Sequence, residues 1–133
     1  MGLGLATADL LCVAPRIDER TVELSMFSMQ GGGTTGNALA TLAVLGAKTR
    51  YFARMGNDEF GTFIMDGLRR LSVDVSLCEP EPDKVSPVSF IQIDELTRRR
   101  KVLFTRGSTT PLTPRDLPRR LLDRANLLYI DGY

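Results

Sequence analysis

The residues with the clearest chemical potential form a glycine-rich run that ends at an asparagine, Gly31-Gly32-Gly33-Thr34-Thr35-Gly36-Asn37. Glycines before a helix let backbone N–H groups approach a ligand closely, and the helix N-terminus adds a positive partial charge. A neutral polyol would be held there by backbone donors and by the side-chain amide of Asn37. The alternative is that Asn37 only caps the helix.

The same run also matches the G-x-G-x-x-G fingerprint of dinucleotide-binding domains, with Asp58 about twenty residues further on. That fingerprint belongs after a buried apolar strand in the first βα unit. Here it follows a half-polar strand that comes after an earlier strand pair. The context therefore favours the polyol over the dinucleotide, and Asp58 is interpreted as a helix cap. The chain has no G-x-x-x-x-G-K-[ST] sequence, which excludes a Walker P-loop within it.

Asp9 is a second candidate, because it stands alone in an apolar run. A carboxylate is costly to bury without partners, so we expect it to bind a ligand rather than to serve as a turn residue. The chain contains no histidine, which excludes Ser-His-Asp and Cys-His catalysis and every His-ligated metal site. We expect no metal site. The basic run 98–101 follows a turn with two acidic residues and is interpreted as a solvated hairpin face.

Composition sets the outer limits of these interpretations. The chain has 133 residues, 43% hydrophobic and 25% charged, with a net charge of +1, which is typical of one globular domain and offers no large basic surface for nucleic acid. Its two cysteines, Cys12 and Cys78, are predicted to be reduced core thiols. No apolar run approaches the length of a membrane helix, and the N-terminus lacks a basic region, so we expect a cytoplasmic protein.

The elements that must position these residues alternate between strands and helices, which predicts an α/β fold with a mainly parallel sheet. Two strand pairs, at about 10–30 and 87–105, are predicted to form a small antiparallel accessory sheet. Within the first pair, residues 21–30 are predicted to form a half-exposed strand with Val22, Leu24 and Met26 pointing inward. Residues 3–13 are predicted to form a buried strand that runs into a short second one. The other predicted strands cover 48–55 and a buried stretch at 127–130. The predicted helices are a buried one at 37–45 with Gly46 at its end, an amphipathic one after Asp58, and one from 111 to 125.

Several segments together resemble the N-terminal half of the PfkB (ribokinase-like) carbohydrate kinases. The glycine pair, Asn37 and the Ala/Leu helix to Gly46 are followed at the family's spacing by Arg54-Met55-Gly56-Asn57-Asp58-Glu59-Phe60-Gly61. The segments 4–9, 71–75, 98–100 and 127–132 resemble the family's first strand, a post-helix stretch, a lid hairpin and the next core strand. Thr35 and Leu39 depart from the family pattern beside the sugar pocket, which puts the substrate in doubt more than the fold.

The resemblance implies ATP-dependent phosphorylation of a sugar or sugar-like alcohol, with ATP and Mg²⁺ as cofactors. It implies a ribokinase-like domain, of which residues 1–133 are the N-terminal part, and a possible homodimer through the lid strands. The implied sugar-binding residues are Asp9, Gly32, Gly33, Asn37 and, as a weaker candidate, Asp131. The implied catalytic base lies beyond residue 133, so we expect the isolated chain to be inactive. The alternatives are a non-catalytic sugar-binding or dimerising half-domain and the dinucleotide-binding domain.

Overall fold

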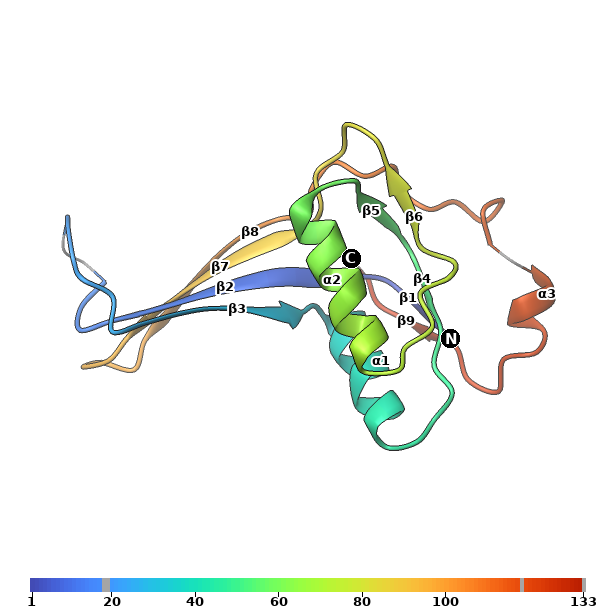
Figure 1. Ribbon diagram of the computed structural model, residues 1–133, viewed down its shortest axis with the longest axis horizontal. Helices are drawn as coiled ribbons and strands as arrows, with labels where there is room; N and C mark the ends of the chain where they lie inside the picture. Colours follow the sequence, from blue (N-terminus) through green and yellow to red (C-terminus); the bar gives the residue numbers. More distant parts are fainter. Residues whose placement is uncertain (18–19, 118, 133) are drawn as a thin grey trace.

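In the part of the chain that the structure describes, nine strands form three sheets, and the two longer helices pack against them (Figure 1). The computed structural model describes residues 1–17, 20–117 and 119–132. In chain order the elements are β1 (Gly2–Leu3), β2 (Thr7–Ala14), β3 (Met26–Gly32), α1 (Thr34–Val44), β4 (Tyr51–Phe52), β5 (Arg54–Gly56), α2 (Glu59–Arg70), β6 (Glu79–Glu81), β7 (Val88–Asp94), β8 (Arg100–Thr105), α3 (Arg119–Leu122) and β9 (Tyr129–Ile130). The predicted α/β architecture, with a parallel sheet, helices and a small antiparallel sheet, is confirmed.

The largest sheet has the strand order β3-β2-β7-β8 and projects away from the two long helices as an arm (Figure 1). We call it the lid sheet. Its outer pairs, β2–β3 and β7–β8, are antiparallel as predicted, and a parallel pairing of β2 with β7 joins them. The first pair begins at Thr7 rather than near residue 10, and its second strand begins only at Met26.

Residues 21–25 are therefore not a strand, and the predicted inward orientation of Leu24 and Met26 is wrong. Their side chains are 43% and 45% exposed. The physical reason is the end of the ladder: β2 stops at Ala14, and the last cross-strand pair is Val13 with Met26. The same projection leaves Cys12 only half-buried, which corrects its prediction as a core thiol, whereas Cys78 is buried as predicted.

A short parallel sheet of order β4-β1-β9 forms the other end of the molecule. The predicted strand at 48–55 is divided into β4 and β5, because β4 pairs with β1 while β5 pairs with β6. The segment 3–13 forms two strands as predicted, divided after Leu3, where Gly4 has a φ of +141°; the second strand, β2, is the longer one. β9 is an edge strand, and Ile130 is 64% exposed. The predicted burial of residues 127–130 is therefore wrong within the described residues, since β9 has a partner on one flank only.

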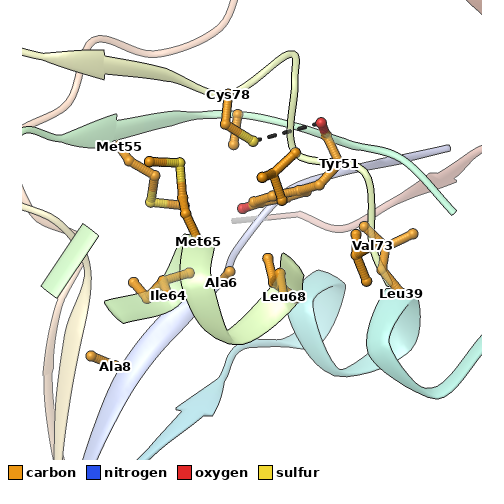
Figure 2. Close-up of a cluster of buried hydrophobic side chains, with 12 residues drawn as sticks. Ala6, Ala8, Leu39, Tyr51, Met55, Ile64, Met65, Leu68, Val73 and Cys78 are labelled. Atoms are coloured by element: carbon orange, nitrogen blue, oxygen red, sulfur yellow. Dashed lines mark hydrogen bonds between the residues drawn. The ribbon is translucent and has the colours of Figure 1, made fainter. Parts of the chain in front are cut away.

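The core lies between the sheets and helix α2 and is centred on Tyr51, which has no exposed surface (Figure 2). The Tyr51 hydroxyl donates to the carbonyl of Gly4 at 2.6 Å, and the Cys78 thiol contacts the Tyr51 carbonyl at 3.6 Å. Burial is the main cause that raises the pKa of the Tyr51 phenol, with Cys78 and Asp131 adding to it. Burial also raises the pKa of the Cys78 thiol to about 12. Both groups therefore stay neutral and act as packing residues.

The helices agree with the sequence in one case and differ in two. α2 begins after Asp58 and buries one stripe as predicted, although Phe60 and Phe63 are only partly buried. α1 ends where Gly46 was predicted to stop it, but it is not buried all round: Val44 is 71% exposed, because the helix packs only through its first half. The predicted helix at 111–125 shrinks to α3, since Asp116 instead accepts the N–H of Thr113 at 2.7 Å.

Candidate functional site

Asp9 lies on β2 at the base of the lid sheet, and its carboxylate is half-buried. The hydroxyl of Thr7, two residues away on the same face of the strand, donates to Asp9 Oδ1 at 2.7 Å. In the ladder Asp9 stands between Gln30 of β3 and Ser89 of β7. These three polar residues share one face of the lid sheet, because cross-strand partners point the same way. Asp9 therefore retains acceptor capacity at a polar position of the sheet.

Gly32 lies directly beside that carboxylate. A Cβ added at Gly32 would fall 2.0 Å from Asp9 Oδ2 and 2.5 Å from its Cγ. A Cβ at the preceding Gly31 would meet no atom within 4 Å. Any side chain at position 32 would therefore displace the Asp9 carboxylate, whereas position 31 tolerates one. The structure thus brings Asp9 and Gly32 together, as the sequence predicts for two residues of one site.

Gly33 has a backbone role at the junction between β3 and α1. Its φ is +83°, and an added Cβ would fall 2.5 Å from the carbonyl oxygen of Leu5. It is the N-cap residue of α1 and makes no side-chain cap bond. The alternative in which Asn37 caps α1 is therefore wrong, since Asn37 lies inside the first turns of the helix. Its side chain is exposed.

Three backbone donors in the first turn of α1 are used within the chain. The N–H groups of Thr35 and Gly36 both donate to the carbonyl oxygen of Leu5, at 3.0 and 3.1 Å. The N–H of Asn37 donates to the Gly33 carbonyl at 3.0 Å. The Thr35 and Gly36 donors tie the helix to the segment between β1 and β2, and the polyol contacts expected from Gly32, Gly33 and Asn37 stay predictions.

A cavity of about 140 Å³ lies between α1, α2 and the end of β3. Gly32 and Asn37 line it together with residues of both helices such as Ala40 and Leu68. Asp9 is not among its lining residues. Its neighbour in the chain, Ala8, belongs to the core cluster that includes Ile64 of α2, and successive side chains of a strand point to opposite faces. Asp9 therefore points away from the core that α2 covers.

Asp131 lies at the carboxyl end of β9, next to Gly4. Its Oδ2 accepts the N–H of Leu5 at 2.9 Å, the hydroxyl of Thr35 at 2.7 Å and the hydroxyl of Thr34. It thus fastens β9 to the start of α1. Thr35 departs from the family pattern, and its hydrogen bond to Asp131 gives a structural reason for a threonine at this position. The sequence did not reveal that reason. A role for Asp131 in ligand binding stays a prediction.

Other kinds of site are not assembled within residues 1–17, 20–117 and 119–132. These residues contain no group of three or more His, Cys, Asp or Glu side chains that could hold a metal ion. In the same part of the chain, no helix has the length and hydrophobicity to cross a membrane. The basic residues Arg98 and Arg99 are exposed at the turn between β7 and β8, where Asp94 accepts the N–H of Thr97 at 2.7 Å.

The glycine-rich run follows β3, which is antiparallel to β2. The dinucleotide fingerprint requires a parallel βα unit at this point. The geometry therefore does not match that of a dinucleotide-binding domain.

Comparisons with curated proteins give similar kinases. The chain is 28% identical over 112 residues to the 2-dehydro-3-deoxygluconokinase of Thermoproteus tenax, covering 82% of this chain and 34% of that protein. It is 29% identical over 128 residues to the 5-dehydro-2-deoxygluconokinase of Geobacillus kaustophilus (strain HTA426), covering 92% and 38%. The chain therefore spans about a third of the length of the curated relatives it matches.

Solved structures share the fold. The PfkB protein from Polaromonas sp. JS666 matches with a TM-score of 0.83 at 22% identity, covering 96% of this chain and 42% of that one. The ribokinase of Arabidopsis thaliana, solved with ribose and ATP, matches with a TM-score of 0.82 at 17% identity, covering 97% and 43%. A family model described as "pfkB family carbohydrate kinase" matches residues 1–133. Since that match spans the whole sequence, the chain belongs to the pfkB family of carbohydrate kinases.

Proposed function

We propose that this chain supplies the sugar-binding part and the lid of an enzyme that phosphorylates a sugar or sugar-like alcohol with ATP. The observation that carries the proposal is the Asp9 carboxylate held against the backbone of Gly32 at the base of the lid sheet. A carboxylate offers only acceptors and therefore suits the paired hydroxyls of a sugar. Gly33 follows Gly32 in the chain, and Asn37 lines a cavity together with Gly32. In this proposal residues 1–133 are part of one ribokinase-like domain.

The lid sheet has a second role in this proposal. Phosphoryl transfer depends mainly on positioning and charge neutralisation, and water competes with the sugar hydroxyl for the phosphoryl group. A sheet that closes over a sugar bound at Asp9 would exclude that water. Gln30 and Ser89, which flank Asp9 on the same face, would lie along the covered side.

ATP and Mg²⁺ are proposed as cofactors on the basis of the family alone. The described residues contain no cluster of three metal-ligating side chains. The N–H groups of Thr35 and Gly36 in α1 are occupied by the Leu5 carbonyl. The proposal therefore assigns sugar binding and water exclusion to the chain.

A dimer through the lid sheet forms part of the proposal. Met29, Phe90 and Leu103 lie in register with Leu10 on one face of the sheet and are 40%, 50% and 49% exposed. Exposed apolar rows of this kind are typical of surfaces that contact another chain. A cytoplasmic location is proposed as well and rests on the two free cysteines, Cys12 and Cys78.

The test is a calorimetric titration of the purified chain with 2-dehydro-3-deoxygluconate, 5-dehydro-2-deoxygluconate and ribose. The wild-type chain is expected to bind at least one of them, and Asp9→Asn to weaken that binding roughly 10- to 150-fold through loss of a charged acceptor. Asp66→Asn, an exposed change on α2, is the matched control. Equal affinity of Asp9→Asn and wild type would refute the assignment of Asp9. Sedimentation velocity on the same samples tests the dimer.

A further inference from the structure

Ser86, just before β7, is enclosed completely and is held by the residue that caps α2. Ser86 has no exposed surface. The Asp58 carboxylate accepts its N–H through Oδ2 at 2.8 Å and its hydroxyl through Oδ1 at 2.7 Å. The same Oδ1 accepts the N–H of Gly61 at 2.7 Å, which is the helix cap that the sequence predicts. Asp58 therefore makes more contacts to Ser86 than capping requires.

Two glycines close the space around Ser86. An added Cβ at Gly56 would fall 2.3 Å from the Lys84 carbonyl oxygen and 2.7 Å from the Ser86 nitrogen. One at Gly61 would fall 2.3 Å from the Gly56 carbonyl oxygen and 2.6 Å from Ser86 Oγ. The N–H of Gly56 also donates to Ser86 Oγ at 3.0 Å. The segment from Gly56 to Gly61 thus forms a closed socket for one serine.

The charge on Asp58 suits this arrangement. Burial alone would raise the pKa of the Asp58 carboxyl, but the N–H and hydroxyl donors of Ser86, followed by the N–H of Gly61, hold that pKa below its usual value. The carboxylate is therefore ionised at neutral pH, and its hydrogen bonds to Ser86 are charge-assisted.

The other end of the β7–β8 hairpin is fastened at the same point. Gly107 follows β8 with a φ of +75°, and an added Cβ there would fall 2.1 Å from the Val85 carbonyl oxygen. The N–H of Ser108 donates to that carbonyl at 2.9 Å, and the N–H of Val85 donates to Ser108 Oγ at 2.9 Å. Both ends of the hairpin therefore converge on residues 85–86, which Asp58 holds against α2.

The register of the lid sheet connects this junction to the sugar-binding position. β7 begins at Val88, two residues after Ser86, and pairs in parallel with β2 from Ala8 onward. The third residue after Ser86 is Ser89, which stands opposite Asp9. A displacement at the socket would therefore move Ser89 relative to Asp9.

We propose that Asp58 and Ser86 form a latch that positions the β7–β8 half of the lid beside Asp9. Asp58 acts as a positioning residue through Ser86 and does not touch the sugar. The part of this inference that concerns sugar binding rests on the proposed function, whereas the anchoring of the hairpin does not.

Hydrogen exchange of the full 133-residue chain, read by mass spectrometry, separates the latch from a simple helix cap. Asparagine caps helices about as well as aspartate, so a cap alone predicts that Asp58→Asn exchanges like the wild type. The latch predicts that Asp58→Asn accelerates exchange in 88–94 and 100–105 about tenfold, because the asparagine NH₂ would face the Ser86 N–H and one charged acceptor is lost. If these two strands exchange in Asp58→Asn at the same rate as in the wild type, the proposal is overturned.

Two further variants keep the test decisive if Asp58→Asn folds poorly. Ser86→Ala leaves the cap on Gly61 intact and removes only the hydroxyl, so it should accelerate the same two strands while the exchange of α2 is unchanged. Asp66→Asn breaks only the exposed ion pair with Arg69 and should leave both strands as in the wild type. Acceleration spread evenly over α2 and the core would indicate general destabilisation and would overturn the latch.

Affinity for 2-dehydro-3-deoxygluconate, measured on the same variants, tests the link to the sugar. The latch predicts weaker binding in Asp58→Asn and Ser86→Ala than in Asp66→Asn. Faster hairpin exchange with unchanged affinity would overturn the positioning role. If the wild-type chain binds none of the three probe sugars, the proposed function of the chain fails, and hydrogen exchange alone still decides whether the latch exists.

Discussion

Replacing Gly32 by alanine adds one methyl group and tests whether the Asp9 carboxylate must lie beside Gly32. The added methyl would stand 2.0 Å from Asp9 Oδ2, about half of an ordinary van der Waals contact, so the carboxylate must rotate away. That rotation breaks the 2.7 Å hydrogen bond from Thr7 to Asp9. Gly31→Ala is the matched control, because it makes the same chemical change one residue earlier in open space.

The two variants should change the free energy of unfolding in opposite directions. At position 31 the backbone is compatible with alanine, and the lower entropy of the unfolded chain stabilises the fold by roughly 0.4–1 kcal/mol. At position 32 the same gain is offset by the lost Thr7 bond and by the displaced carboxylate. Loss of one charged hydrogen bond to the sugar costs about 1.5–3 kcal/mol, which corresponds to roughly 10- to 150-fold weaker binding.

The assay combines urea unfolding with calorimetric titration of whichever probe sugar the wild type binds. We expect Gly31→Ala to keep the wild-type affinity and to raise the free energy of unfolding slightly. We expect Gly32→Ala to lose affinity by about the same factor as Asp9→Asn, since both remove the same acceptor. If Gly32→Ala binds as tightly as Gly31→Ala, the carboxylate does not need its place beside Gly32, and the site is assigned wrongly.

Two further outcomes follow from the core. At pH 8.5 iodoacetamide should label the half-buried Cys12 in the native chain and Cys78 only after unfolding. Burial shields the Cys78 thiol and raises its pKa to about 12. Peptide mass spectra that show equal labelling of both cysteines in the native chain would contradict this prediction. Tyr51→Phe should lower the free energy of unfolding by about 0.5–1.5 kcal/mol, because it removes the 2.6 Å hydrogen bond to the half-buried Gly4 carbonyl. An unchanged urea midpoint would refute that reason.

The sequence predicted best those elements whose signals are local. α2 was predicted because its cap, Asp58, and its apolar stripe lie within one segment. The strand predicted at 21–30 begins only at Met26, because alternation describes a strand only where a partner exists, and β2 ends at Ala14. The predicted helix at 111–125 is reduced to α3, because Asp116 accepts the N–H of Thr113 and also binds Arg54 at 2.8 Å, a contact between residues 62 positions apart. Such long-range partners have no signature in a local window.

In the candidate site, too, the sequence predicted features that depend on local signals but not those that depend on long-range contacts. Asp9 was predicted as a candidate because a lone acidic residue in an apolar run is unusual, and Gly32 because it precedes a helix. Their mutual contact depends on the register of β2 and β3, which no pattern in either strand specifies uniquely. The three donors to Asp131, which include Thr34 and Thr35, depend on β9 and α1 meeting in space.

A motif can be specific to a family without touching the ligand. The segment from Gly56 to Gly61 carried much of the resemblance, and its glycines could suggest close approach to a phosphate or a sugar. In the structure the atoms that these glycines admit are the backbone and hydroxyl of Ser86 and the Lys84 carbonyl. A side chain at either glycine would force backbone atoms apart, which costs more than moving the end of a flexible side chain. The constraint on this segment is therefore explained by the junction between α2 and the lid sheet, whereas sugar binding is proposed for Asp9.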